Sequence, residues 1–285
     1  MTRFINTTKT ALLMGAMMGL VLAAGYIFGR GPGLMIAFVL GGAMNVVAFF
    51  FSDKIAIATM RGQEVDEQSY PDLLEMVGRL ARNADLPMPR VYVCPQQAPN
   101  AFATGRSPKK AAVAVTQGAL QLLDYDELEG VMAHELAHVK NRDTLTSTVA
   151  ATIAGAISML GYLFMFGGGR DRDVNPLIAL GFVILAPIAA SIIQMAISRS
   201  REFVADHDGA EIAGTPNGLI SALQKLDSMA QRVPLNNKNP AQNQMFIVPP
   251  MNMAAGGGAI GGGLANLFRT HPQTEKRIAK LREMA

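Results

Sequence analysis

Four long stretches of this chain contain no Asp, Glu, Lys or Arg, and they restrict its folds more than any other feature. They cover residues 10–29, 31–52, 144–169 and 174–198, which are runs of 20, 22, 26 and 25 residues. A helix needs roughly 20 apolar residues to cross the hydrocarbon core of a bilayer. One such run is compatible with a buried core helix, but four favour membrane spans. Only 16% of the 285 residues are charged, against about 25% in soluble domains, which argues against a wholly soluble or disordered protein.

The four runs pair into two predicted transmembrane hairpins, over residues 10–52 and 144–198. A cleaved signal peptide is the alternative for the first run, but the run is long for one and a second run follows at once. We expect both termini in the cytoplasm and a multi-pass protein in the cell inner (plasma) membrane, because positive residues mark the cytoplasmic side. Arg30, Arg170 and Arg172 lie at the turns and weigh against this orientation. The open ends of both hairpins are flanked by Arg3, Lys9, Lys54, Arg61, Lys140, Arg142, Arg199 and Arg201.

The remaining polar sequence lies in two segments, 53–143 and 199–285, which we expect to fold together as one cytoplasmic domain. Its pattern predicts mainly α structure with a small β-sheet. Residues 231–268, rich in Asn, Pro, Met and Gly, predict a flexible loop. Capping residues or Pro followed by apolar residues at helical spacing predict helices that begin at Ser69, Asp124, Thr215 and His271. Short apolar runs predict strands at 90–94, 101–104 and 111–115.

The strongest chemical signal is the sequence His134-Glu135-Leu136-Ala137-His138. Positions i and i+4 share one face of a helix, so the two imidazoles can both reach one zinc ion at about 2.0–2.1 Å. Glu135 is rotated by about 100° from His134 and lies beside the ion, where a carboxylate can accept a proton from the attacking water. Two surface histidines on an amphipathic helix are the alternative, but the apolar neighbours of the motif place this helix in a core.

A catalytic zinc ion usually takes a third protein ligand, for which His207, His271 and a carboxylate are the candidates. The second hairpin helps to choose among them. His138 lies six residues before Thr144, where the third run begins, and Glu202 lies five residues after Ile197, near the end of the fourth. Because the hairpin is antiparallel, its two ends return to one level. Glu202 can therefore meet the histidines just above the cytoplasmic face of the membrane.

These motifs together resemble the HtpX family of membrane-bound heat-shock zinc proteases. The resemblance rests on the HELAH sequence, the hairpin that follows it, and the segments 200–206, 270–272 and 99–105. It implies a gluzincin-type metalloprotease domain with one zinc ion per subunit, bound by His134, His138 and Glu202, and with Glu135 as the catalytic acid/base. It also implies a stress response in which damaged or misfolded membrane proteins are degraded alongside an ATP-dependent membrane protease.

Five further residues are candidates for the site. Asp206, four residues after Glu202, accepts the free ring N–H of a ligand histidine or, alternatively, pairs with a nearby arginine; we favour the first role. His271 stabilises an oxyanion or caps its own helix. Asn100, Ala101 and Phe102 are expected in an edge strand that pairs with an extended substrate, although an ordinary sheet strand is the alternative.

Three features exclude other classes of site. The single cysteine, Cys94, excludes an intramolecular disulfide framework, and its apolar neighbours predict a buried position. The formal net charge of +3 without a basic run argues against a nucleic-acid partner. His207 is rotated away from Glu202 on a helix and is expected at the surface.

The sequence therefore predicts an integral-membrane zinc metalloendopeptidase in the lipid bilayer, and the resemblance implies that its substrates are membrane proteins. A prenyl-protein protease is the alternative enzyme, but such relatives have more than four spans. A zinc-stabilised membrane scaffold or small transporter is the non-enzymatic alternative. It would not require Glu135, and the four runs hold no charged residue that could carry an ion.

Overall fold

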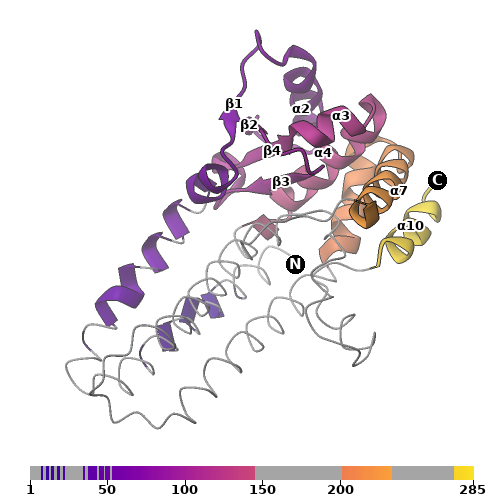
Figure 1. Cartoon of the computed structure of the whole chain (residues 1–285). Coiled ribbons are helices and arrows are strands. Elements are labelled where there is room, and N and C mark those ends of the chain that lie inside the picture. The colour runs from indigo at the N-terminus through magenta and orange to yellow at the C-terminus, as the bar shows by residue number, and fades with distance from the viewer. Residues whose placement is uncertain are drawn as a thin grey trace. The chain divides into compact units, whose positions relative to one another are not determined.

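The computed structural model describes residues 53–144, 201–232 and 273–285, together with single residues and short stretches between Thr8 and Phe51 (Figure 1). The chain divides into two compact units, one of Met1–Ser52 and Leu145–Gln194 and the other of Asp53–Thr144 and Met195–Ala285. The third and fourth predicted spans, except for Thr144, lie outside the described residues, as do His271 and most of the predicted loop.

A four-stranded mixed sheet lies at the centre of the second unit. Its order is β1-β2-β4-β3, so that β3 is an edge strand. β2 and β4 are parallel, whereas the β1–β2 and β3–β4 pairs are antiparallel. The strands are β1 (Gln63–Glu64), β2 (Arg90–Cys94), β3 (Ala101–Thr104) and β4 (Ala112–Thr116). The three predicted strands are confirmed, the last of them one residue later than expected, while β1 is too short to show a pattern.

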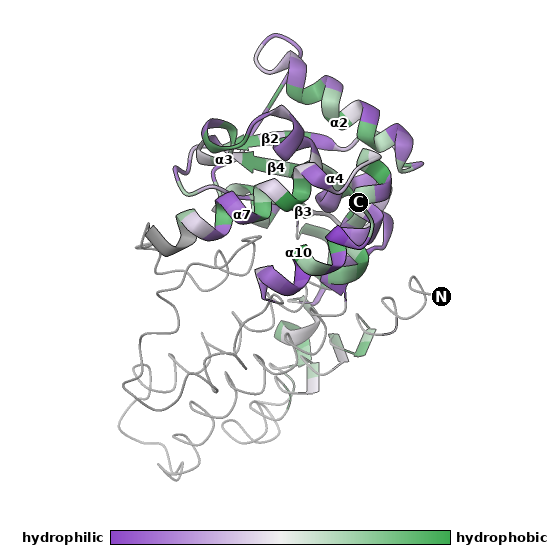
Figure 2. Cartoon of the chain, turned by 90° about the vertical axis from the view of Figure 1, so that its right-hand side faces the viewer, coloured by the Kyte–Doolittle hydropathy of each residue, from purple (hydrophilic) through white to green (hydrophobic). Residues whose placement is uncertain are grey.

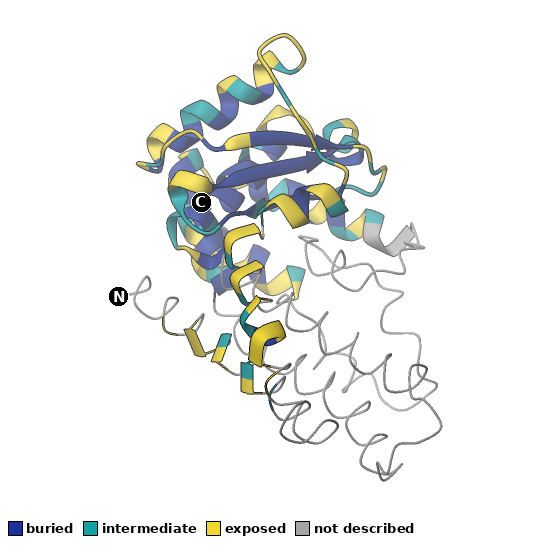
Figure 3. Ribbon diagram, turned by 90° about the vertical axis from the view of Figure 1, so that its left-hand side faces the viewer, coloured by how far each residue is buried: buried dark blue, intermediate teal, exposed yellow. Residues whose placement is uncertain are grey.

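Both faces of this sheet are covered, which explains why β2, β3 and β4 are largely apolar along their length. Val91, Val93, Val113 and Val115 face the main core. The alternate residues, including Phe102 of β3, face a smaller core closed by residues 56–60, which belong to or directly follow the helix Asp53–Thr59. Figure 2 shows β4 in the hydrophobic colour, and Figure 3 shows most of the sheet as buried. Cys94 is buried in the smaller core, as predicted.

The first helix of this core is α2 (Pro71–Asn83), and its N-cap lies one residue later than predicted. Tyr70 is the N-cap and Pro71 occupies the first turn, where the missing N–H of proline has no cost. Ser69 was therefore the wrong cap. Its side chain and backbone instead bond Asp66, with Ser69 N donating to Asp66 Oδ1 at 2.8 Å and Asp66 N to Ser69 Oγ at 3.1 Å.

The central helix is α4 (Tyr125–Lys140), which begins at the predicted capping residue Asp124. Asp124 accepts from Glu127 N, and the Glu127 side chain accepts from Asp124 N, both at 3.0 Å. The elements that pack around α4 include α2, β3 and α7 (Asn217–Arg232). The unit also contains α3 (Gln117–Leu122), the helix at residues 201–213 and α10 (Thr274–Arg282). α7 continues to Arg232, so the predicted loop begins later than residue 231.

Two glycines allow α4 and α7 to lie in close contact. A Cβ atom on Gly130 would collide with the backbone of Leu219, and one on Gly218 would collide with the backbone of Asp126. This crossing holds α4 against the rest of the core, and α4 carries both histidines of the predicted zinc motif.

The Gly130→Ala substitution should therefore destabilise the protein by about 1–3 kcal/mol, as overpacking of a core does. Gly78→Ala in α2 is the matched control, because its Cβ would meet only side-chain atoms at 3.7 Å. The control should be neutral or stabilising by about 0.5–1 kcal/mol, since alanine favours a helix over glycine. The midpoint of thermal unfolding of the purified chain measures both. A Gly130→Ala protein as stable as wild type would contradict this account of the crossing.

The described part of the first unit is helical and exposes large apolar side chains. Phe38 is 57% and Val39 61% exposed, and Phe50 and Phe51 are also exposed. In the part of the chain that the structure describes, no single helix has the length and apolar character of a membrane span. One pair of successive helices, Phe38–Phe51 and Asp53–Thr59, meets those criteria jointly, by length and composition only.

Candidate metal centre

The two motif histidines lie one turn apart on α4 and face one carboxylate from the helix at 201–213. His134 Nε2 and His138 Nε2 are 3.2 Å apart. Glu202 Oε2 lies 3.7 Å from the first nitrogen, and Glu202 Oε1 lies 3.6 Å from the second. Of the three third-ligand candidates, the structure thus brings Glu202 to the histidines. His207 points elsewhere, with 56% of its side chain exposed.

These separations fit a metal ion. Ligand atoms at 2.0–2.1 Å from a tetrahedral zinc ion lie about 3.3 Å from one another. The donor atoms of His134, His138 and Glu202 all lie within 4.8 Å of one another, and the group is largely buried. Two imidazoles and one carboxylate are also a ligand set typical of catalytic zinc.

Gly209 allows the helix that carries Glu202 to approach α4. A Cβ atom at this position would lie 2.9 Å from His134 Cα and 3.0 Å from His134 N. A larger residue would push the two helices apart at the level of the first histidine. The sequence analysis missed Gly209, because only the packing of two distant segments shows that its position has no room for a side chain.

A carboxylate lies beside the second ring nitrogen of each histidine. Asp206 Oδ1 is 3.0 Å from His134 Nδ1, and Asp143 Oδ2 is 3.1 Å from His138 Nδ1. Such partners fix the ring and the tautomer, so that both Nε2 atoms can present lone pairs to a metal ion. Asp206 lies close enough to His134 for its predicted role, which stays a prediction, whereas Asp143 was not predicted. Without a metal ion, burial disfavours a charged His138, but Asp143 and Glu202 outweigh it and raise the pKa of His138 to about 9. A metal ion that binds Nε2 therefore displaces a proton from this ring.

Arg277 of α10 joins the centre from the far end of the chain. It is 1% exposed, and it donates to Asp206 through Nε at 2.9 Å and Nη2 at 2.7 Å. Its Nη1 lies 3.7 Å from Glu202 Oε2. Although burial alone would raise it, the charge and hydrogen bonds of Arg277 hold the pKa of Asp206 at about 2. The missed signal was helical spacing, since Arg277, Ile278 and Leu281 share one buried face.

The buried charges of the centre also call for a cation. Six ionisable side chains other than histidine are buried there: Glu135, Asp143, Glu202, Asp206, Arg201 and Arg277. With the carboxylates ionised and both histidines neutral, as metal binding requires, these four acids and two bases leave a net charge of −2. Unbalanced buried charge is costly, and a divalent ion would cancel it.

Glu135 lies beside the candidate ligands and contacts the edge strand. Its Oε2 accepts a hydrogen bond of 2.8 Å from Ala103 N. Burial raises the pKa of Glu135 above its ordinary value, although the neighbouring histidines oppose the shift. A raised pKa brings a carboxylate closer to the range in which it exchanges protons efficiently near neutral pH.

The edge strand β3 presents alternate backbone groups away from the sheet. Asn100 and Thr116 bond across the β3–β4 pair, with Thr116 N donating to Asn100 O at 2.9 Å. Because bonded and outward residues alternate, the outward groups belong to Ala101 and Ala103, while the Phe102 side chain lies in the smaller core. Substrate binding by Asn100, Ala101 and Phe102 remains a prediction. Ala103, in the same predicted strand, donates its N–H to Glu135.

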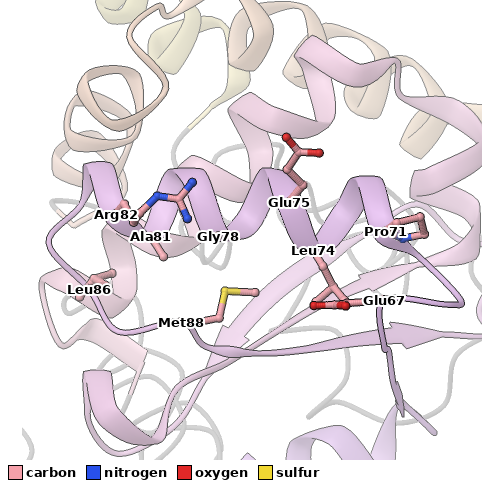
Figure 4. Close-up of a pocket in the computed structure, with 9 residues that line it drawn as sticks. All are labelled: Glu67, Pro71, Leu74, Glu75, Gly78, Ala81, Arg82, Leu86 and Met88. Carbon is pink, nitrogen blue, oxygen red and sulfur yellow. The ribbon is translucent and has the colours of Figure 1, made fainter.

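One hollow in the described residues lies apart from this centre. A groove of about 590 Å³ runs along α2 and is lined by Leu74, Gly78, Arg82 and Met88 among others (Figure 4). Its lining includes none of the predicted site residues. We therefore place the functional site at the α4 histidines.

Comparison with known proteins identifies the family of this chain. The sequence pattern of Peptidase family M48 matches residues 67–285. The chain belongs to peptidase family M48. It is 51% identical over 284 residues to a protein named Protease HtpX homolog from Methylibium petroleiphilum, covering 98% of each chain. It is 50% identical to a protein of the same name from Burkholderia multivorans, covering 98% of this chain and 97% of that one. The predicted resemblance to the HtpX family is confirmed.

A solved structure shares the fold of this M48 peptidase. The chain aligns with the crystal structure of S. mikatae Ste24p at a TM-score of 0.52 and 17% identity, over 98% of this chain and 66% of that one. The similarity supports a mainly helical protein with a small mixed sheet. At this identity it concerns the fold alone.

The ligand assignment predicts opposite outcomes for two residues on one helix. Glu202→Ala should lose metal binding and activity, because only two ligands remain. His207→Ala should retain both, because its side chain is exposed. Zinc quantification on the two purified variants after dialysis measures the difference. Full zinc in the Glu202 variant and loss in the His207 variant would show that the ligand set is wrong.

Replacing Arg277 tests the support of the centre. Arg277→Met leaves Asp206 buried without its counter-charge, which typically costs about 3–5 kcal/mol. It should also weaken zinc binding by about 10–100-fold, as changes beside a ligand histidine do. Lys276→Met, an exposed neighbour on α10, is the control and should change neither unfolding nor zinc affinity. Equal unfolding stability and equal zinc affinity of the two variants would show that Arg277 does not support the metal centre.

Proposed function

We propose that this M48 peptidase is an integral-membrane zinc endopeptidase with one zinc ion per subunit. The observation that carries the proposal is the convergence of His134, His138 and Glu202 within chelating distance, with the Glu135 carboxylate beside them. A zinc ion held there would act as a Lewis acid toward a peptide carbonyl and would make water a better nucleophile at neutral pH.

The chain's own residues supply the rest of the reaction. Glu135 accepts a proton as water attacks the scissile carbonyl and donates it to the leaving amine. The Ala103 N–H holds that carboxylate at the edge of β3. The Ala103 N–H is taken by Glu135, so an extended substrate segment would pair as an added strand with the outward backbone groups of Ala101 and the Ala103 carbonyl. His271, outside the described residues, is a proposed oxyanion donor.

We propose membrane proteins as the substrates, in particular damaged or misfolded ones. The four uncharged runs and the exposed apolar residues of Phe38–Phe51 support residence in a bilayer. The helix Asp53–Thr59 follows directly and packs on the sheet through Ala56 and Ile57. A site close to the membrane needs only a short extended segment of an embedded substrate. Cooperation with an ATP-dependent membrane protease and a role in the stress response are part of this proposal.

Glu135→Gln should abolish proteolysis and leave zinc bound, because Glu135 lies beside the ligands and is not one of them. The loss should be at least the ~10²–10⁴ that general acid–base catalysis provides. Casein cleavage and zinc content of the two purified proteins measure it. A variant that cleaves casein at nearly the wild-type rate contradicts the role of Glu135. Cleavage confined to prenylated peptides would favour the prenyl-protein protease, and zinc without any cleavage by wild type would favour the scaffold.

We call the second unit, Asp53–Thr144 and Met195–Ala285, the catalytic unit. The proposed orientation places it in the cytoplasm of the cell. Single cysteines at Lys109 and Ala285, both exposed, should be protected from an impermeant maleimide until the inner membrane is broken. Cysteines at Gly31 and Gly168, in the predicted turns, should react once the outer barrier is opened. The buried Cys94 is replaced beforehand to give a silent background. The reverse labelling pattern would place the catalytic unit outside the cytoplasm and contradict the proposed orientation.

A further inference from the structure

The turn at the end of α4 contacts three elements of the catalytic unit at once. α4 ends at Lys140, and Arg142 takes a left-handed backbone conformation with φ of 57°. Asn141 Nδ2 donates to Asp208 Oδ2 at 2.6 Å, Asp143 lies beside His138, and Thr144 Oγ1 donates to Gly105 O at 2.8 Å. Asp143 and Thr144 are buried, although both are polar and lie beyond the helix.

Asp143 connects two of the three candidate metal ligands. Its Oδ2 lies 3.1 Å from His138 Nδ1, and its Oδ1 lies 3.7 Å from Arg201 Nη1. The same Arg201 nitrogen is 3.3 Å from the Asp143 backbone oxygen, to which it donates. Arg201 directly precedes Glu202. One aspartate therefore orients a ligand histidine on α4 and anchors the start of the helix that carries the carboxylate ligand.

Thr144 connects the same turn to the edge strand. Gly105 directly follows β3 and continues its alternation, in which the backbone groups of Ala101 and Ala103 point away from β4. The carbonyl oxygen of Gly105 accepts a hydrogen bond from the Thr144 hydroxyl. A side chain on Gly105 would collide with the backbone of Lys110, and its φ of 121° disfavours other residues. The end of β3 is therefore fixed from both sides, close to the Ala103 N–H that reaches Glu135.

We propose that Asp143 and Thr144 are positioning residues that hold the metal centre and the substrate strand in one fixed arrangement. Asp143 acts on the metal centre through His138 and Arg201, and Thr144 acts on substrate binding through the end of β3. The proposal rests on the proposed function and deepens it. It predicts that two adjacent residues affect different constants, Asp143 the zinc affinity and Thr144 the KM.

The experiment uses the full-length protein with zinc, and labelled casein as the probe. Asp143→Ala should weaken zinc binding by about 10–100-fold and change the visible spectrum of the cobalt-substituted protein. Thr144→Val should raise KM by up to about tenfold, the effect of one lost hydrogen bond, with zinc affinity and kcat close to wild type. Thr144→Ser, which keeps the hydroxyl, should restore KM. Glu129→Gln, on α4 in an ion pair with Arg79, is the control and should change none of these.

Several outcomes would overturn the inference. Wild-type zinc affinity and an unchanged cobalt spectrum in Asp143→Ala would show that Asp143 does not position the metal ligands. An equal KM for Thr144→Val, Thr144→Ser and wild type would show that Thr144 does not position the strand that binds substrate. If Asp143→Ala does not fold, Asp143→Asn replaces it and should show the same direction in zinc affinity and spectrum. Failure of the proposed function is distinct, because the wild-type protein itself would then neither bind zinc nor cleave casein.

Discussion

The paired hydrogen bonds between Arg277 and Asp206 are the interaction on which the metal centre depends. They fix a carboxylate that orients His134, and they place a permanent positive charge near Glu202. α4, the helix at 201–213 and α10 meet there, although they lie far apart in the sequence. The centre therefore exists only when the two parts of the catalytic unit fold together, which makes metal binding a measure of native folding.

The sheet links this centre to the surface that an extended peptide would use. One face of β3 packs in the smaller core through Phe102, and its outward edge reaches Glu135 through the Ala103 N–H. The helix Asp53–Thr59 therefore supports β3 through the smaller core, and Thr144 fixes the end of the strand by its hydrogen bond to Gly105 O. Rigid elements on several sides keep a catalytic arrangement within the narrow geometry that it needs.

The sequence was most informative where its signals were local. The capping box at Asp124 and Glu127 and the i, i+4 spacing of the histidines predicted α4 and its motif, because both patterns are complete within one helix. Asp143 was missed because a polar residue after a helix has no special signal alone. Arg277 was missed because its helical spacing with Ile278 and Leu281 indicates burial but not what the side chain contacts. Their roles come from contacts between segments that are distant in the sequence, and these contacts require the fold.

X-ray absorption spectroscopy of the zinc-loaded wild-type protein tests the central claim most directly. The account predicts a first shell of nitrogen and oxygen atoms only, at about 2.0–2.1 Å, with the outer scattering of two imidazole rings. A sulfur atom at about 2.3 Å, which only Cys94 or a methionine could supply, would contradict it. So would a shell with fewer than two imidazoles, because His134 and His138 would then not both bind the ion.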